Sequence, residues 1–179
     1  MDEYITLRNL LLTISTTVGI ILFCVTLMRI SASSSGMSSR NYTPTQFILM
    51  LLVSVMMISS VTYMDMGSYT FFEGDAFTVA ESDPWLVEGN IANILAQLNL
   101  MGEDIDQFSR IVTYFFAFMK LLGISLFLFA LGNTFNASSG NNSKSMRIIA
   151  FQYIFGVLFF NFGNIVQMLA SSSGFQINI

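Results

Sequence analysis

Histidine is absent from the 179 residues, and cysteine occurs only once, as Cys24. Without an imidazole the chain can hold neither a Ser-His-Asp triad nor a zinc site of the usual kind. A single cysteine also excludes a disulfide within the chain. The sequence contains no phosphate-binding loop and no dinucleotide-binding fingerprint. We therefore expect no catalytic residues, no metal site and no catalytic cofactor, and the chain is not expected to be an enzyme.

Charge is also scarce, because 10% of the residues are charged and 54% are hydrophobic. Soluble domains carry about 25% charged residues, so the expected solvent is a membrane. Four apolar runs approach the length of about 20 residues that crosses a hydrocarbon core, and they lie at 10–28, 46–63, 111–131 and 148–170. A segment in lipid must satisfy its own backbone hydrogen bonds, so all four runs are predicted as transmembrane helices.

The few charges differ between the connectors. The connector after the first run holds Arg29 and Arg40, the connector after the third holds Lys144 and Arg147, and neither contains an acid. The segment 64–110 holds nine of the eleven acidic residues. Basic short loops stay in the cytoplasm, so both connectors are predicted inside, with 64–110 and both termini outside. Acids in place of a basic leader at 2–3 indicate that the first run is a retained span and not a signal peptide.

The predicted fold is therefore an all-α integral membrane protein that forms one membrane domain over 1–179. It comprises a helical hairpin at 10–63, an acidic extracytoplasmic segment at 64–110 and a second hairpin at 111–170. Within the acidic segment, Pro84 and an apolar stripe predict an outer amphipathic helix near 84–101, preceded by a loop. The carboxylates at 103–106 are expected to cap the third span, because their spacing is not that of a calcium loop. The similar connectors fit either an internal duplication or a shared loop composition.

The fourth run contains the most evident packing surface. Small residues let membrane helices approach closely, and amide side chains form hydrogen bonds between them. Two glycines lie seven residues apart, Gly156 and Gly163. Three amide residues follow one another at every third position, Asn161, Asn164 and Gln167. We expect these residues to form helix contacts, either within the chain or between subunits.

Lys120 lies midway along the third run. A bare ammonium at that depth costs several kcal/mol, and such groups usually face a partner, a cavity or a pore. A lysine about 15 Å deep in a core about 30 Å thick reaches the surface poorly. We therefore expect a functional role or a contact with a lipid headgroup, the latter if the helix begins near Asp104 and extends beyond the membrane.

The four-span layout, the acidic outer segment and the "SASSSG" and "ASSG" connectors resemble the small inner-membrane proteins of type IVB secretion and IncI-type conjugation, the DotE/IcmC and TraQ group. Each hairpin is also similar to a conjugative pilin. The pilin resemblance implies two apolar helices joined by a short basic loop, which assemble helically with bound phospholipid and place the loop toward a lumen. Those pilins carry one hairpin, whereas this chain carries two.

These resemblances imply a self-associating structural subunit of a DNA-transfer or secretion apparatus in the bacterial inner membrane. Its partners would be further copies, other apparatus subunits and membrane lipid, and a pilus form would reach the cell surface. Arg29, Arg40, Lys144 and Arg147 would then either line a conduit for nucleic acid or contact lipid headgroups, or serve only as topology signals. No sequence-specific binding of nucleic acid is expected. The alternative function is a holin-like or channel-forming protein that acts alone.

Overall fold

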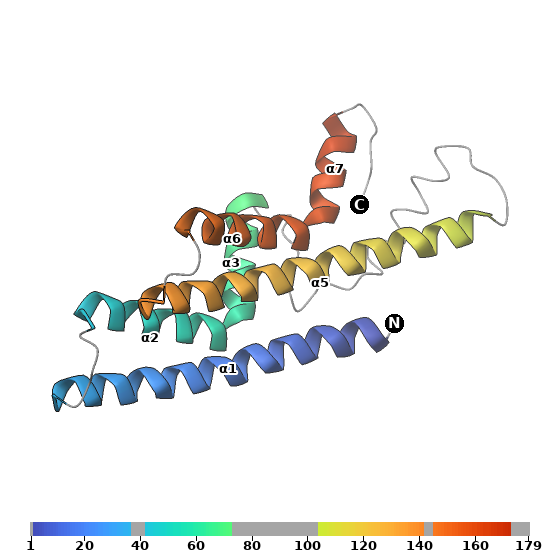
Figure 1. The fold of residues 1–179 in the computed structure, drawn as a ribbon. Helices are drawn as coiled ribbons and strands as arrows, with labels where there is room; N and C mark the ends of the chain where they lie inside the picture. Colours follow the sequence, from blue (N-terminus) through green and yellow to red (C-terminus); the bar gives the residue numbers. More distant parts are fainter. Residues whose placement is uncertain (1, 37–41, 73–103, 142–144, 173–179) are drawn as a thin grey trace.

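A computed structural model describes residues 2–36, 42–72, 104–141 and 145–172, and its regular elements are all α-helices. They are α1 (Asp2–Ser34), α2 (Pro44–Ile58), α3 (Ser60–Phe72), α5 (Asp104–Ser138), α6 (Met146–Phe160) and α7 (Phe162–Ser172) (Figure 1). By length and composition α1 and α5 can each cross a membrane, and α2 with α3 counts as a third span if the bent pair is taken together. The all-helical class is confirmed, and the chain carries apolar helices suited to a membrane.

The second predicted span is interrupted. Helix α2 has 15 residues, or about 22 Å of rise, and it ends before Ser59. Helix α3 then continues at an angle of 91° to α2 and runs to Phe72. The loop predicted at 68–80, between the second span and the outer helix, was therefore wrong for residues 68–72, which belong to α3. The residues that α3 buries recur every four positions and so form one face against the protein: Ser60, Met64, Ser68 and Phe72.

The fourth predicted span is interrupted in the same way. Helix α6 again has 15 residues and ends before Asn161, and α7 has 11 residues. Gly156 and Gly163 consequently lie on two different helices. The seven-residue groove that a continuous span would have formed does not exist, because the chain turns between the two glycines.

Both connectors are shorter than the sequence predicts, since α1 and α5 continue into their serines. Ser34 Oγ donates to the Ser31 carbonyl at 2.8 Å, and Ser138 Oγ donates to the Thr134 carbonyl at 2.8 Å. Hydroxyls that bond back to the preceding turn make serine compatible with a helix end. Gly36 and Gly140 follow each helix with φ of 70° and 75°, the left-handed conformation that favours glycine.

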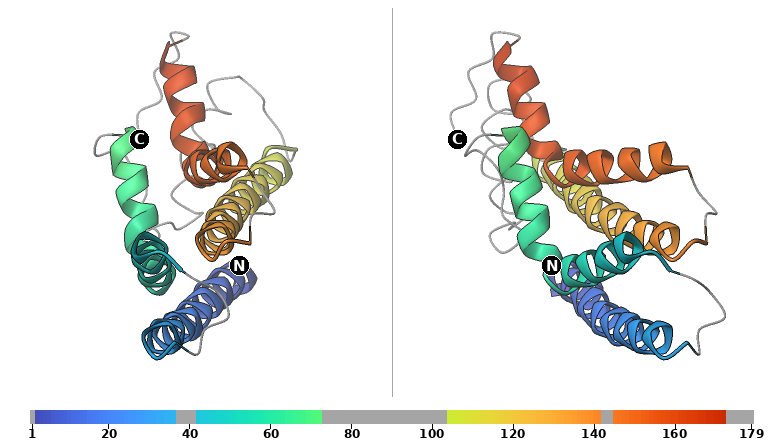
Figure 2. Two further views of the ribbon diagram at one scale, coloured as in Figure 1. Left: turned by 60° about the vertical axis from the view of Figure 1, so that its left-hand side comes forward. Right: turned by 90° about the vertical axis from the view of Figure 1, so that its left-hand side faces the viewer.

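The described helices form two equivalent units, α1–α3 (the first unit) and α5–α7 (the second unit). Each unit has a long helix, a positive-φ glycine, a 15-residue helix that begins after a hydroxyl N-cap (Thr43 or Ser145), a one-residue break and a short final helix. In Figures 1 and 2 the long helices run in the same direction, and α3 and α7 turn off toward the same side. The units are therefore repeats with a common orientation.

When the two units are aligned by their helices, the sequences of the long helices are similar at corresponding positions. "GIILF" at 19–23 of α1 corresponds to "GISLF" at 123–127 of α5, and "SSG" at 34–36 corresponds to "SSG" at 138–140. The second part of each unit aligns through its N-cap and its break, Ser59 with Asn161. The similarity between the halves thus extends beyond the connectors, which favours an internal duplication.

The main core lies where α2, α5 and α6 meet. It comprises Met50, Val53, Met57, Met64, Ile124, Phe127, Leu131, Phe135, Val157 and Phe160. The predicted outer helix near 84–101 lies outside the described residues, as do Arg40 and Lys144.

Candidate functional site: polar contacts at two helix breaks

In the first unit, side chains of α1 hold the break between α2 and α3. Ser15 Oγ donates to the Met57 carbonyl at 2.9 Å, and Thr16 Oγ1 lies 3.5 Å from the Ile58 carbonyl. A broken helix in lipid leaves backbone groups that neighbouring helices must satisfy. The Ser15 hydroxyl supplies a donor where α2 releases its last carbonyls, whereas Thr16 Oγ1 lies closer to the Leu12 carbonyl of its own helix, at 3.0 Å. Gly19 allows this approach, because a Cβ there would lie 2.8 Å from the Ile58 nitrogen.

Replacing Ser15 with alanine should therefore lower the free energy of unfolding by about 1 kcal/mol, since one buried carbonyl loses its donor. The measurement is thermal unfolding in detergent, followed by circular dichroism. Thr17→Ala is the matched control, because Thr17 is exposed and its hydroxyl donates only to Thr13 of its own helix, at 2.8 Å. Equal melting temperatures for the two variants would contradict the assigned role of Ser15.

In the second unit, Asn161 itself occupies the break. Its Nδ2 donates to Ser68 Oγ of α3 at 2.7 Å and to the Val157 carbonyl at 3.0 Å. Asn161 and Ser68 are fully buried, and among the described residues Asn161 Oδ1 is a buried acceptor with no hydrogen-bond donor. One amide therefore ties the end of α6 to α3, which belongs to the other unit.

Lys120 lies at the same corner of the fold. Phe116, one turn before it on α5, packs against Phe162 with ring centroids 5.8 Å apart, and Gly123, one turn after it, approaches the backbone of Phe160. Residues three and four apart share a helix face, so Lys120 points to the level at which α6 ends and α7 begins. The side chain is 1% exposed. The side chain is therefore buried within the protein.

Lys120, Asn161, Asn164 and Ser68 are all buried, and we refer to them as the α6–α7 corner. In the register of the two units Lys120 occupies the position of Thr16, since Gly123 corresponds to Gly19. The second unit thus places an ammonium where the first places a hydroxyl. This difference makes the α6–α7 corner the candidate functional site.

Contacts within the chain account for Gly156. A Cβ on Gly156 would lie 2.9 Å from the Phe127 nitrogen and 3.1 Å from the Gly123 carbonyl. Hydrogen bonds continue this contact between α5 and α6, with Asn133 Nδ2 donating to Gln152 Oε1 at 2.8 Å. Of the other predicted contact residues, Gly163 is half-buried in α7, and only the backbone of Gln167 is described.

The two described connector bases differ in environment. Arg29 is half-buried, with its guanidinium carbon 5.6 Å from the centroid of the Tyr42 ring and Nη1 3.5 Å from Met50 Sδ. It therefore packs against the start of α2. Arg147 is exposed in the first turn of α6, where its backbone N–H donates to Ser145 Oγ at 3.4 Å. Arg147 is thus the more exposed of the two.

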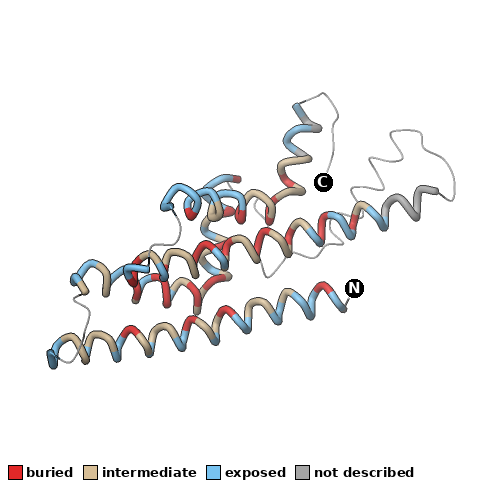
Figure 3. Tube along the Cα trace, viewed as in Figure 1, coloured by how far each residue is buried: buried red, intermediate tan, exposed pale blue. Residues whose placement is uncertain are grey.

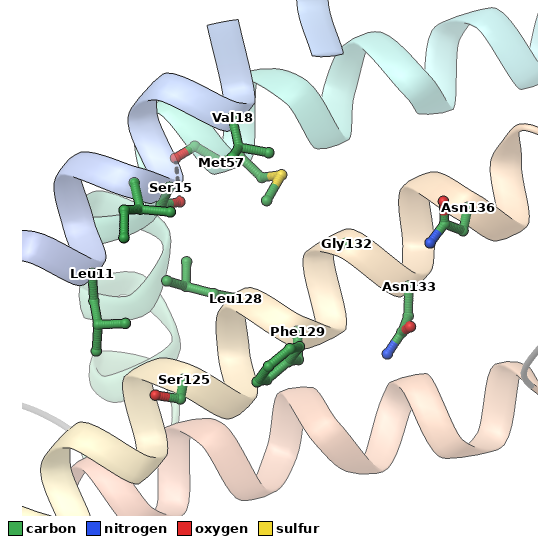
Figure 4. A pocket seen from close by; sticks show the side chains of 11 residues that line it. Leu11, Ser15, Val18, Met57, Ser125, Leu128, Phe129, Gly132, Asn133 and Asn136 are labelled. Carbon is green, nitrogen blue, oxygen red and sulfur yellow. Dashed lines mark hydrogen bonds between the residues drawn. The ribbon is translucent and has the colours of Figure 1, made fainter. Parts of the chain in front are cut away.

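A groove of about 360 Å³ lies between α1 and α5, beside the end of α2 (Figure 4). Its walls are mostly apolar, with Leu11, Val18, Leu128 and Phe129 among the lining residues. Asn133 and Asn136 line the part nearest the end of α5. The groove is therefore apolar along most of its length and has amide side chains at one end.

Within the part of the chain that the structure describes, no group of three or more His, Cys, Asp or Glu side chains could hold a metal ion. No protein-family model matches the chain, and neither the curated proteins nor the solved structures yielded a similar protein.

Proposed function

We propose that the chain is a self-associating structural subunit of a membrane-embedded apparatus for conjugative DNA transfer or type IV secretion. The observation that carries this proposal is the pairing of two equivalent units, α1–α3 and α5–α7, in a common orientation. Each unit packs on the other through one face. The opposite face of each unit is then available to pack on a unit of another copy. The class of apparatus is inferred from the resemblance of the layout and connectors to those of conjugation and secretion proteins.

In this proposal each unit crosses the inner membrane twice, once through its long helix and once through its bent pair. The connectors at Gly36 and Gly140 face the cytoplasm, the termini and 64–110 lie outside, and 84–101 forms the outer amphipathic helix. The parallel long helices support this arrangement, because they bring both connectors to the same end of the molecule. A tag within 64–110 that is accessible only from the cytoplasm would refute it.

The groove between α1 and α5 suits the acyl chain of a phospholipid. Its apolar walls match hydrocarbon, and Asn133 and Asn136 lie toward the connector end, where a headgroup would be. A pilin-like form of the subunit would polymerise with lipid in this groove and reach the cell surface. Other apparatus subunits would be further partners.

The connector bases have two alternative roles in such an assembly, as topology signals or as the lining of a conduit that nucleic acid passes through. Replacing Arg29, Arg40, Lys144 and Arg147 together with glutamine separates them. If the bases line a conduit, DNA transfer falls while tag accessibility shows unchanged topology. Full transfer with unchanged topology would exclude the conduit.

Negative-stain microscopy of the purified protein, with ion leakage measured on expression alone, tests the function itself. A structural subunit should form rings or filaments and leave the membrane sealed, because the apparatus needs its other components. A holin-like channel would instead depolarise cells on its own. Single particles the size of a monomer, or leakage from cells without the partner proteins, would overturn the proposal.

A further inference from the structure

We propose that copies of the chain associate head to tail, with α6 of one copy packed on α1 of the next, by repeating the contact that already joins the two units. The proposal specifies the self-association on which the proposed function rests. Its partner is a second copy of this chain, and its basis is the equivalence between the units.

The internal contact is made by α2 of the first unit against α5 of the second. Met50, Val53 and Met57 of α2 enter the same buried core as Ile124 and Leu131 of α5. This contact covers one face of α2 and one face of α5. Each face has a counterpart in the other unit, on α6 and on α1 respectively.

On α6 the counterpart face is exposed at Phe151 and Phe155 and half-buried at Phe159. Leu49, Val53 and Met57 of α2 correspond to Phe151, Phe155 and Phe159 of α6, a set that we call the phenylalanine ladder. Val53 is 2% exposed, whereas Phe155 is 45% exposed. The ladder rings follow one another at 6.2 and 5.9 Å between centroids. Helix α6 thus presents an ordered aromatic ridge in the sector where α2 buries Val53 and Met57.

On α1 the counterpart face is uncovered as well. Ile124, Leu128 and Leu131 of α5 correspond to Ile20, Cys24 and Leu27, which we call the outer face of α1. Ile124 and Leu131 are 1% and 0% exposed, but Ile20 and Leu27 are 50% and 47% exposed. Figure 3 shows the same contrast, with α5 buried at many positions and α1 exposed or half-buried along most of its length.

The orientation of the units makes the contact compatible with a membrane. Helix α6 runs opposite to α1, as α2 runs opposite to α5, and the long helices of both units run in the same direction (Figures 1 and 2). Successive copies would therefore share one sidedness. The ladder meets a different surface on its partner, so the contact is heterologous and generates a ring if the rotation closes or a filament if it does not.

Association in lipid depends on packing between preformed surfaces, because lipid tails provide no hydrophobic drive. Both faces lie on regular helices, and the ladder rings already pack against one another, so little ordering remains to be done on binding. These properties favour a second copy over loosely held lipid at the two faces.

The native Cys24 permits a direct test in isolated membranes. Phe159→Cys places a second thiol opposite it, since the internal counterparts Met57 and Leu128 line the same groove. Oxidation with copper phenanthroline should then give a series of covalent multimers on non-reducing gels. Phe155→Cys, in the exposed centre of the ladder, is the second variant and should behave alike.

Two controls fix the geometry. Ile154→Cys should not cross-link, because Ile154 corresponds to Leu52, which stays exposed in the first unit despite the internal contact. Phe159→Cys combined with Cys24→Ala should give no dimer, since a head-to-tail contact does not bring two copies of one residue together. A two-fold dimer would cross-link in that variant and would overturn the proposal.

The remaining outcomes separate this interface from the function. If neither ladder variant cross-links while the same membranes yield rings or filaments, the interface is wrong and the proposed function stands. If the protein is monomeric throughout, both fail. Unchanged melting temperatures for the cysteine variants establish that a missing cross-link does not result from misfolding.

Discussion

Replacing Gly123 with alanine is expected to push α5 and α6 apart and to destabilise the second unit strongly. A Cβ at this position would lie 2.4 Å from the Phe160 nitrogen, 2.7 Å from the Gly156 carbonyl and 2.9 Å from the Phe160 Cα. All three are backbone atoms, so no side-chain rotation relieves the clash. Overpacking costs about 1–3 kcal/mol where side chains can adjust. We expect a loss of at least about 3 kcal/mol here, because two helix backbones must separate.

Gly132→Ala on the same helix is the matched control, because a Cβ there would have no atom within 4 Å. Gly19→Ala should have an intermediate effect, since its shortest contact, 2.8 Å to the Ile58 nitrogen, is less severe than the 2.4 Å contact at Gly123. Thermal unfolding in detergent should therefore rank the melting temperatures as Gly132→Ala above Gly19→Ala above Gly123→Ala. Comparable stability of the Gly123 and Gly132 variants would show that the close approach of α5 to α6 is dispensable.

The apolar runs predicted the helical class and the approximate positions of the helices, but they did not predict the two breaks. Neither Ser59 nor Asn161 is a glycine or a proline, the residues that usually signal a kink. Hydrophobicity along a run is the same whether the helix continues straight or turns by 91°. At the turn after α2, the hydroxyl of Ser15, which lies far away in the sequence, donates to the Met57 carbonyl. A local pattern contains no information about such a contact.

The sequence predicted some residues of the candidate site but not how they contact one another. Lys120, Asn161 and Asn164 are unusual residues in apolar runs, and a polar group in lipid indicates a specific contact. The hydrogen bond from Asn161 to Ser68 was not predictable, because Ser68 lies in a segment for which the sequence predicts a loop. Gly123 was missed altogether. The shared "GI-LF" pattern at 19–23 and 123–127 was the available signal, since it marks the glycines of closest approach in both units.

Removing the charge of Lys120 is the other substitution with a large expected effect. Lys120→Met keeps most of the buried stem and deletes the ammonium. A buried charge persists only where the fold compensates for its lost hydration, and here the C-terminal end of α6, with its partial negative charge, lies at the same level of the fold. Without the ammonium, the partial negative charge at the end of α6 has no cation to balance it. We expect the free energy of unfolding to fall by about 2 kcal/mol, whereas Arg110→Met, an exposed charge on the same helix, should change it little.

Lys120→Thr tests whether Lys120 serves only the fold or also the function. The substitution gives the second unit a threonine at the position that Thr16 occupies in the first unit. A hydroxyl at this position can donate to the carbonyls at the end of α6, as Thr16 approaches the Ile58 carbonyl at 3.5 Å. Lys120→Thr should therefore unfold at a higher temperature than Lys120→Met and keep its oligomeric state. If the apparatus uses the ammonium itself, DNA transfer is lost in both variants despite the recovered fold. Wild-type transfer by Lys120→Thr would instead assign Lys120 to holding the break alone, the task that a hydroxyl performs in the first unit.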